Sequence, residues 1–421
     1  MHDGPRTQFD AIVVGAGPAG STVALLLARS GWSVALIERQ RFPRRKVCGE
    51  CLAASNLPLL CVLGIADAFD ALAGPALRQV RLLRGADAVT ADLPAADHER
   101  YPWGRALGRE TLDSLLLDQA RAAGAVVFQP WAVQSILGGA GAWHCEARAV
   151  ESTSLLRLGA KVVVDAHGSW EDLPTDRLKR RHARSAADLF AFKANFSGSA
   201  LPENQINVLA LPGGYGGMVV AEGGLMTLAC CIRRDRLSRL RGSAPGLSAS
   251  DAVEAWLRRD CTGVQYALQG ALREGPWLAS GPLDPGMRIA ARDGIFRVGN
   301  AAGEAHPILG EGMSMALQSA ALLCSHLLGR QGPEAVPDAA VQASLQRAYR
   351  AAWTREFGPR LRLAAMFAQL AMRPRSARLL MRLVALWPGL LTRGARWGGK
   401  VRMAELAGTT ALAGTSPSDS L

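Results

Sequence analysis

The 421-residue chain lacks any apolar run long enough to span a bilayer. The longest candidate, Leu379 to Leu391, is interrupted by Arg382 and Pro388. The first residues, Met1 to Thr7, are polar and lack the apolar stretch of a secretory signal peptide. We therefore expect a cytoplasmic protein whose association with the inner membrane, if there is one, is peripheral.

The sequence also lacks a disulfide framework and a zinc-binding pattern. Its eight cysteines follow no repeating spacing, which is typical of reduced thiols. Cys48-Gly49-Glu50-Cys51 is formally a CxxC pair, but no second CxxC and no histidine follows at zinc-ligand spacing. We expect no metal site, and Cys48 and Cys51 are either a redox-active dithiol or two structural thiols.

Acidic residues are scarce near the C-terminus. Residues 355–402 contain eleven Lys or Arg against one acid, Glu356, within a chain of net charge +12. These charges are interleaved with leucine, methionine, Phe367, Trp387 and Trp397, a composition typical of a surface that lies on anionic lipid. The alternative is a helical cap whose arginine stems cover the core. No nucleic-acid-binding module accompanies the charge, so we expect no nucleic-acid partner.

The most informative stretch runs from Phe9 to Glu38. A short apolar run passes into Gly15-Ala16-Gly17-Pro18-Ala19-Gly20, then a helical pattern, then a second strand that ends at Glu38. Glycines at this spacing allow a tight turn, the approach of a pyrophosphate to a helix N-terminus, and close packing of helix on sheet. Because Glu38 would accept hydrogen bonds from an adenosine ribose and repel a 2′-phosphate, the pattern predicts FAD or NAD rather than NADP.

Two later stretches repeat the arrangement of a strand followed by small residues. The run Lys161 to Asp165 ends in Ala166-His167-Gly168, and open α/β sheets bind ligands at such strand ends. Residues 299–313, Gly-Asn-Ala-Ala-Gly-Glu-Ala-His-Pro-Ile-Leu-Gly-Glu-Gly-Met, lead into an apolar helix from Ser314 to Leu328. Its N-terminus can hold a phosphate or stabilise negative charge on a reduced flavin.

Between these stretches the patterns predict an amphipathic helix that starts at Arg109 and ends at Gly124. Arg109 is either a solvated surface residue or a clamp on the cofactor. Strands are expected at Val80–Asp92, Leu155–Leu158 and between Phe190 and Ile232. The glycine-dense Pro212–Gly217 is interpreted as a place where backbone approaches a flat ligand, the alternative being a flexible hairpin.

The remaining predictions concern the last third of the chain. Met287–Ala290 and Ile295–Val298 are predicted to form a hairpin across Asp293-Gly294. The region after Gln331 is predicted to be helical, with helix ends near Gly358-Pro359, Pro374 and Pro388-Gly389.

The glycine turn with Glu38, the run Asp165–Gly168 and residues 299–313 together resemble the FAD-binding motifs of one superfamily. It holds the p-hydroxybenzoate-hydroxylase-type monooxygenases, the geranylgeranyl reductases and the flavin-dependent halogenases. Residues 46–50, Lys-Val-Cys-Gly-Glu, resemble the loop after the second strand in its reductase-like branch. The matches cover Phe9 to about Leu328.

The resemblance implies an α/β fold, in which an FAD-binding Rossmann-like domain of the glutathione-reductase type carries an intertwined β-sheet substrate domain and a helical C-terminus. We assign residues 8–75, 100–170 and 283–330 to the FAD-binding domain, and residues 76–99 and 171–282 to the sheet-rich substrate domain, with an exposed crossover at 171–184. Residues 331–403 form the basic helical region and residues 404–421 a disordered tail.

The resemblance also implies an extended FAD, with its adenosine at Glu38, its ribityl chain near Asn300 and Arg109, and its isoalloxazine against residues 307–312. The implied cofactor-binding residues are Gly15, Gly17, Pro18, Ala19, Gly20, Glu38, Arg39, Cys48, Gly49, Arg109, Gly299, Asn300, Pro307, Gly310, Gly312 and Met313.

The chain departs from these relatives at several positions. Gly299-Asn300 replaces a Gly-Asp pair, and asparagine can still hydrogen-bond a ribityl hydroxyl. His167 stands where hydroxylases usually carry an Asp linked to FAD and nicotinamide nucleotide, so NAD(P)H is only one candidate reductant. The WxWxIP motif of halogenases and the YxWxFP stretch of geranylgeranyl reductases are absent, and Tyr215-Gly216-Gly217-Met218-Val219-Val220 takes the place of the latter.

We therefore expect an FAD-dependent oxidoreductase of secondary metabolism, and first a monooxygenase (hydroxylase) that acts on a lipophilic or aromatic small molecule. One alternative, favoured by the Cys48 loop, is a geranylgeranyl-reductase-like alkene reductase of a prenyl or polyketide lipid. Another is a membrane-surface-binding flavoprotein whose basic C-terminus is the functional surface. Several titratable residues flank the flavin-facing stretches and are candidate acids, bases or substrate anchors, or else structural hydrogen-bonding groups: Glu50, His167, Tyr215, Glu304 and His306.

Overall fold

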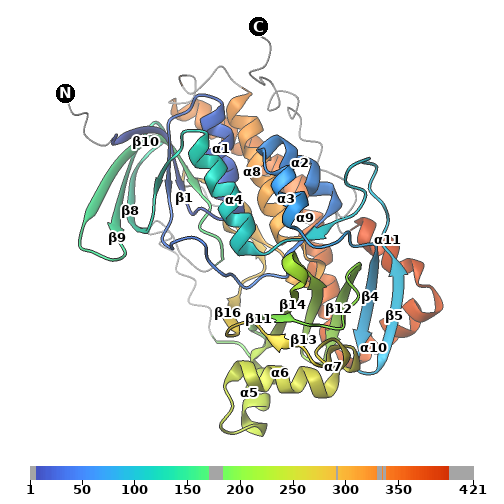
Figure 1. Cartoon of the computed structure of the whole chain (residues 1–421). Helices are drawn as coiled ribbons and strands as arrows, with labels where there is room; N and C mark the ends of the chain where they lie inside the picture. The colour runs from blue at the N-terminus through green and yellow to red at the C-terminus, as the bar shows by residue number, and fades with distance from the viewer. Residues whose placement is uncertain (1–5, 170–183, 291–292, 330–333, 335–337, 398–421) are drawn as a thin grey trace.

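The computed structural model describes residues 6–169, 184–290, 293–329, 334 and 338–397. The predicted tail lies outside these residues, as does nearly all of the predicted crossover. Two β-sheets lie beside one another, with helices between and around them (Figure 1). No helix among the described residues is long and apolar enough to cross a membrane.

The first sheet has seven strands, in the order β7-β2-β1-β10-β9-β8 with β18 beside β10. The strands β7, β2, β1, β10 and β18 run parallel, and β9 and β8 extend the sheet in antiparallel pairs. Their bounds are β1 (Gln8–Val14), β2 (Val34–Ile37), β7 (Val126–Phe128), β8 (Trp131–Gly139), β9 (Ala142–Ala149), β10 (Leu155–Asp165) and β18 (Phe296–Arg297).

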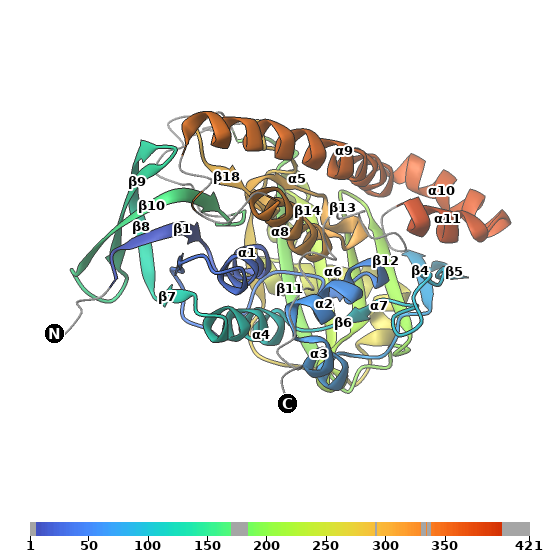
Figure 2. The ribbon, with the colours of Figure 1, turned by 90° about the horizontal axis from the view of Figure 1, so that it is seen from above.

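Three helices pack on the parallel part of this sheet: α1 (Pro18–Arg29), α4 (Arg109–Ala122) and α8 (Gly312–Leu328). The long helix α9 (Ala339–Met372) crosses over α8, as Figure 2 shows. The helix α1 packs so closely that a Cβ at Gly20 would lie 1.8 Å from the Gly15 carbonyl oxygen. The predicted strand-helix-strand unit and the helix that begins at Arg109 are confirmed.

The second sheet has eight strands, in the order β15-β11-β14-β13-β12-β4-β5 with β16 beside β11. One face packs on α6 (Ala249–Asp260) and α7 (Thr262–Ala267), which follow α5 (Arg234–Ser243), and Ser248 caps the N-terminus of α6. The strands are β4 (Gln79–Arg84), β5 (Asp87–Asp92), β11 (Leu189–Ser197), β12 (Gln205–Leu211), β13 (Gly214–Val220), β14 (Met226–Arg233), β15 (Leu272–Arg273) and β16 (Leu278–Leu283).

The opposite face of the second sheet meets the first sheet's loops and the C-terminal helices. The end of α9 and the helix α10 (Pro374–Leu386) pack against it, and α11 (Gly389–Trp397) lies along β5. Thr392 Oγ1 donates a hydrogen bond of 2.7 Å to the Asp92 carbonyl and so fixes α11 at this edge. The helix ends predicted near Pro374 and Pro388-Gly389 are confirmed, because α9 ends at Met372 and α10 ends at Leu386.

Short elements connect the two sheets. They are β3 (Cys51–Leu52), β6 (Arg105–Ala106), β17 (Gly286–Met287), β19 (Gly303–Glu304), the helices α2 (Leu57–Leu63) and α3 (Ala66–Leu72), and single 3₁₀ turns at Ala54–Asn56, Glu222–Gly224, Gly299–Ala301 and Pro307–Leu309.

The predicted hairpin across Asp293-Gly294 is wrong. The strand β17 pairs with β19, and β18 enters the first sheet beside β10. The Asp293 carboxylate accepts hydrogen bonds of 2.9 Å and 2.6 Å from the guanidinium of Arg297. Asp293 therefore supports the entry of a buried parallel strand rather than a two-residue turn.

The predicted helix end at Gly358-Pro359 is also wrong, because α9 continues through Pro359. Proline lacks the N–H that would bond the preceding turn. The flanking side chains compensate: Phe357 is buried, and the guanidinium of Arg360 donates to Gln318 of α8 at 2.8 Å and to Glu356 at 2.5 Å. Packing against α8 thus overrides the local signal.

Glycines of two predicted segments lie within strands. Leu155–Asp165 is one strand, because Gly159 makes room for the Gln8 side chain, whose Oε1 would lie 2.2 Å from a Cβ at that position. Gly214 to Gly217 belong to β13, and Pro212-Gly213 form the hairpin turn that joins β13 to β12. A Cβ at Gly216 would lie 2.7 Å from the Ala229 carbonyl oxygen, so close strand packing requires this glycine.

Candidate active site

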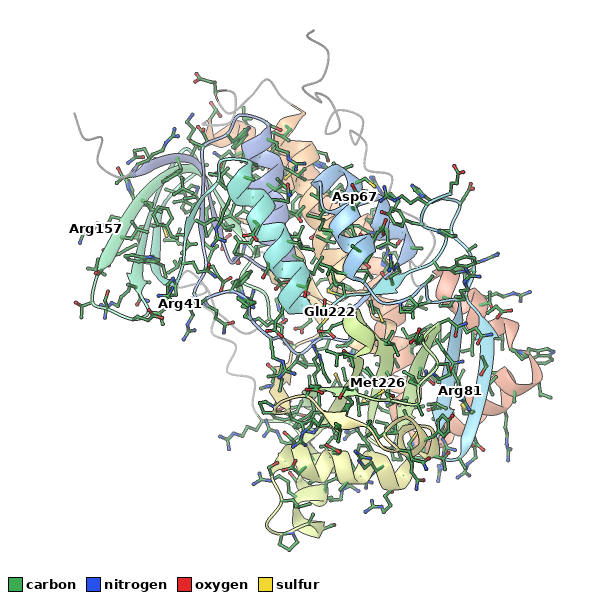
Figure 3. All side chains as sticks on the ribbon, viewed as in Figure 1. Arg41, Asp67, Arg81, Arg157, Glu222 and Met226 are labelled. Atoms are coloured by element: carbon green, nitrogen blue, oxygen red, sulfur yellow. The ribbon has the colours of Figure 1, made fainter. Side chains whose placement is uncertain are left out.

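A cavity lies where the loops of the first sheet face the second sheet. Figure 3 shows Glu222, from the turn between β13 and β14, at this junction. One wall consists of the glycine turn, the loop after β2, the end of β10 and the start of α8. The other consists of Ala191, Ile206, Tyr215, Gly216, Gly217, Met218, Val219, Ala229, Cys230, Cys231 and Leu283.

The glycine turn faces two arginines. A Cβ at Gly17 would lie 3.6 Å from Arg44 Nη2 and 3.8 Å from Arg109 Nη2. Gly17 is also the N-cap of α1, and no side chain caps that helix end. Free N–H groups, the helix dipole and two guanidinium groups therefore converge on one small space, which fits a pyrophosphate.

Arg109 is held in place for such a contact. Its Nε and Nη2 donate to the two oxygens of Asp113 at 2.7 Å and 2.8 Å, and Asp113 is fully buried. Burial alone would lower the pKa of Arg109, but Asp113 and Cys48 raise it above its usual value. Only 14% of its side chain is exposed, so the surface-residue alternative is wrong. Arg44 Nη2 lies 3.6 Å from the same carboxylate.

Glu38 lies at the expected end of β2 and lines the cavity. Its Oε2 accepts the Ala16 N–H and its Oε1 accepts the Gln40 N–H, both at 2.8 Å. These bonds fix a carboxylate that retains acceptor capacity toward the cavity, as an adenosine ribose requires. Two predicted residues lie elsewhere: Gly20 serves helix packing, and Arg39 is exposed and does not line the cavity.

The start of α8 also lines the cavity. Gly310 has a left-handed φ of 63°, and no side chain caps α8 at Glu311. Asn300 Nδ2 donates to Ser169 Oγ at 2.7 Å. The predicted residues Gly299, Asn300, Pro307, Gly310, Gly312 and Met313 all line the cavity, as do Gly15, Pro18, Ala19, Cys48 and Gly49. The cavity thus contains two uncapped helix N-termini, which fits a long dinucleotide.

His167 follows β10 and also lines the cavity. Its Nδ1 contacts Asp165, whose carboxylate is buried and lies 3.6 Å from Arg297 Nε. This contact fixes the orientation of the imidazole at the strand end.

Glu50 carries the only left-handed φ among the described residues other than glycine, at 60°. Its carboxylate is buried and contacts Lys193 of β11, the Thr227 hydroxyl of β14 and, at 3.2 Å, the Arg109 N–H. Lys193 is itself 2% exposed. A buried ion pair therefore ties the Cys48 loop to the second sheet.

Tyr215 and His306 form a second polar cluster. The Tyr215 hydroxyl lies 3.2 Å from His306 Nδ1 and is hydrogen-bonded to the Cys231 thiol. Burial raises the pKa of Tyr215 well above its usual value and that of Cys231 to about 12. Burial lowers the pKa of His306. Burial also raises the pKa of Glu304, although the positive charge of Arg288 acts to lower it. Two protonated donors and a neutral imidazole thus lie together.

The remaining predictions can be placed on the structure. Cys48 and Cys51 are not joined in a disulfide, and Cys48 Sγ accepts the Glu50 N–H at 3.3 Å. Among the described residues, no group of His, Cys, Asp or Glu could hold a metal ion.

Sequence reasoning missed five residues around the cavity: Arg44, Asp113, Lys193, Thr227 and Cys231. Lys193 had a usable signal, because it is the one charge in the apolar run Phe190 to Phe196. Asp113 and Thr227 had none, since polar residues at their positions are ordinary in an amphipathic helix and in a strand.

Residues 8–186 match the family model described as FAD binding domain. A tryptophan 2-halogenase from Chondromyces crocatus is 27% identical over 320 residues, covering 74% of this chain and 59% of the relative. The chain thus spans less than two thirds of the length of that relative. A menaquinone reductase from Mycobacterium tuberculosis is 28% identical over 353 residues, covering 78% of this chain and 80% of the relative.

The structure of the myxobacterial chondrochloren halogenase CndH matches 97% of this chain and 98% of its own, with a TM-score of 0.68 and 20% identity. At this identity the likeness concerns the fold alone. Residues 8–186 thus carry an FAD binding domain, and the chain is similar in sequence and in fold to FAD-dependent oxidoreductases.

Proposed function

We propose that the chain is an FAD-dependent monooxygenase that hydroxylates a lipophilic or aromatic small molecule. The proposal rests on the wall that the second sheet presents to the FAD-binding loops. Among the described residues that line this wall, none is charged. The small residues Ala191, Gly216, Gly217 and Ala229 make its surface flat. A flat apolar molecule fits such a wall.

The chain's own residues supply binding and proton handling. Arg44, Arg109 and the uncapped end of α1 would hold the pyrophosphate of FAD, and the second sheet would shield the bound flavin from water. Bound FAD supplies the two-electron chemistry with oxygen. A substrate C–H, O₂, two electrons and two protons give C–OH and water, and NAD(P)H is the proposed electron donor. The neutral His306 can accept a proton from a substrate hydroxyl through Tyr215.

A second candidate is reduction of a carbon–carbon double bond in a prenyl or polyketide lipid. The menaquinone reductase relative aligns over most of both chains. Tyr215 and Cys231 are protonated donors beside the wall, suited to give the proton that accompanies a hydride. Halogenation is less favoured, because the chain lacks the WxWxIP motif.

Product analysis separates the candidates. The holoenzyme is incubated with NADH or NADPH and with phenolic or prenylated test compounds, in air and under argon. The masses of the products are then measured by mass spectrometry. We expect one added oxygen atom in air and no product under argon. Two added hydrogens under argon would overturn the monooxygenase proposal in favour of the reductase.

A further inference from the structure

The helix α10 carries apolar residues on two opposite sides. Ala377, Met381 and Val384 are buried against the body of the protein. On the other side Leu379, Leu383 and Leu386 are 59%, 37% and 70% exposed. Their spacing of four and three residues aligns them in one row along the helix. A helix that only caps the protein needs only the buried side chains, so the exposed leucines indicate a further binding partner.

The exposed row continues past the end of α10. Trp387 is 62% exposed and Leu390 is 39% exposed. Figures 1 and 2 agree in placing α10 and α11 at one extremity of the molecule, beyond the edge strand β5. We call these five side chains, Leu379, Leu383, Leu386, Trp387 and Leu390, the outer apolar row.

Basic side chains flank the outer apolar row. Arg375, Arg378 and Arg382 repeat at three and four residues on the adjacent side of α10, and Arg393 and Arg396 follow on α11. All five are exposed, and no carboxylate among the described residues pairs with them. The sequence contains no Asp or Glu from residue 357 to residue 404.

We propose that α10 and α11 form a docking surface for a lipid bilayer that contains acidic phospholipids. Arginines bind headgroup phosphates while leucine and tryptophan enter the interfacial layer. A second copy of the chain fits poorly, because a symmetric contact would bring together five arginines from each copy without an acid. Nucleic acid would satisfy the arginines but would leave the row of leucines in water.

The buried side of α10 places this docking surface close to the cavity. Ala377 and Met381 belong to the same apolar cluster as Tyr215 and Cys231 of the cavity wall. A bilayer at the outer apolar row would therefore lie about one helix diameter from the layer that lines the cavity. The docking surface does not depend on the reaction, so its test stands apart from the proposed function.

The test is co-sedimentation of the full-length holoenzyme with vesicles of phosphatidylglycerol and phosphatidylcholine in equal parts, or of phosphatidylcholine alone. We expect binding to the acidic vesicles that weakens in high salt, and at least tenfold weaker binding to the neutral ones. The variants L383Q/L386Q and R378Q/R382Q should each bind acidic vesicles at least tenfold more weakly than the native chain.

Matched controls come from the far end of the molecule. Leu137 is 63% exposed on β8, and the Arg157 side chain is 79% exposed on β10, far from α10 in Figure 3. The variants L137Q and R157Q should bind vesicles as the native chain does, and all variants should keep native FAD content and circular dichroism. The proposal fails if the native chain ignores acidic vesicles, or if both pairs of variants bind like the controls. It also fails if L383Q/L386Q abolishes a dimer in sedimentation velocity instead of vesicle binding.

Discussion

The ion pair between Glu50 and Lys193 offers the sharpest test of how the two sheets are joined. Both side chains are almost fully buried, at 2% and 3% exposure. The variant Lys193→Met keeps the length of the stem and removes the ammonium. Of its partners in the described part of the chain, the Glu50 carboxylate then retains the Thr227 hydroxyl and the Arg109 N–H. Removing one partner of a buried pair costs about 3–5 kcal/mol, because the remaining charge stays buried and uncompensated.

The double variant E50Q/K193M should be more stable than K193M. It removes the uncompensated charge, and the residual cost is that of two neutral side chains in a space built for an ion pair. The losses in the free energy of unfolding of the single variants E50Q and K193M should therefore add up to more than the loss in the double variant, by about 2 kcal/mol or more.

Urea unfolding followed by circular dichroism measures these differences, on the protein without FAD so that cofactor loss does not enter. The matched control is Lys161→Met, which breaks a 2.8 Å contact with Asp10. The Lys161 side chain is 33% exposed, so its loss should cost about 1 kcal/mol or less. If K193M behaves like K161M, or if the two single losses add up in the double variant, the pair does not join the sheets as described.

Three further outcomes follow from the site. Arg109→Lys loses the two-pronged contact with Asp113, so the dissociation constant of FAD should rise about 10- to 100-fold in a fluorescence titration, whereas Arg121→Gln should leave it unchanged. Gly17→Val puts methyl groups toward Arg44 and Arg109, so FAD binding should be lost while circular dichroism stays native. Burial lowers the pKa of His306 from 6.5, so the unfolded chain binds a proton that the folded chain does not. Neutral His306 therefore makes its full contribution to the free energy of unfolding above pH 6.5, and this contribution shrinks as the pH falls. In His306→Asn, the urea concentration at the unfolding midpoint should change less between pH 5 and 7 than in the native chain.

The parts of the site that sequence predicted are those built from consecutive residues. The turn from Gly15 to Gly20 sets its own backbone and the start of α1, so spacing alone places it. The same holds for residues 299–313 at the start of α8. Asp293-Gly294 shows the limit of this logic. Its local pattern favours a turn, yet β18 pairs with β10, more than a hundred residues earlier, because a buried parallel strand gains more than an isolated hairpin.

The second wall of the cavity depends on contacts that no local pattern encodes. Alternation along β11 and β14 predicts that Ala191 and Lys193 share a face, as do Thr227 and Cys231. It does not predict that this face meets the Cys48 loop, which lies more than a hundred residues away in the chain. Only that meeting gives Lys193 its partner Glu50 and makes a lone charge in an apolar strand tolerable. A buried lysine without a local partner is therefore a sign of a distant acid, which here is Glu50 of the Cys48 loop.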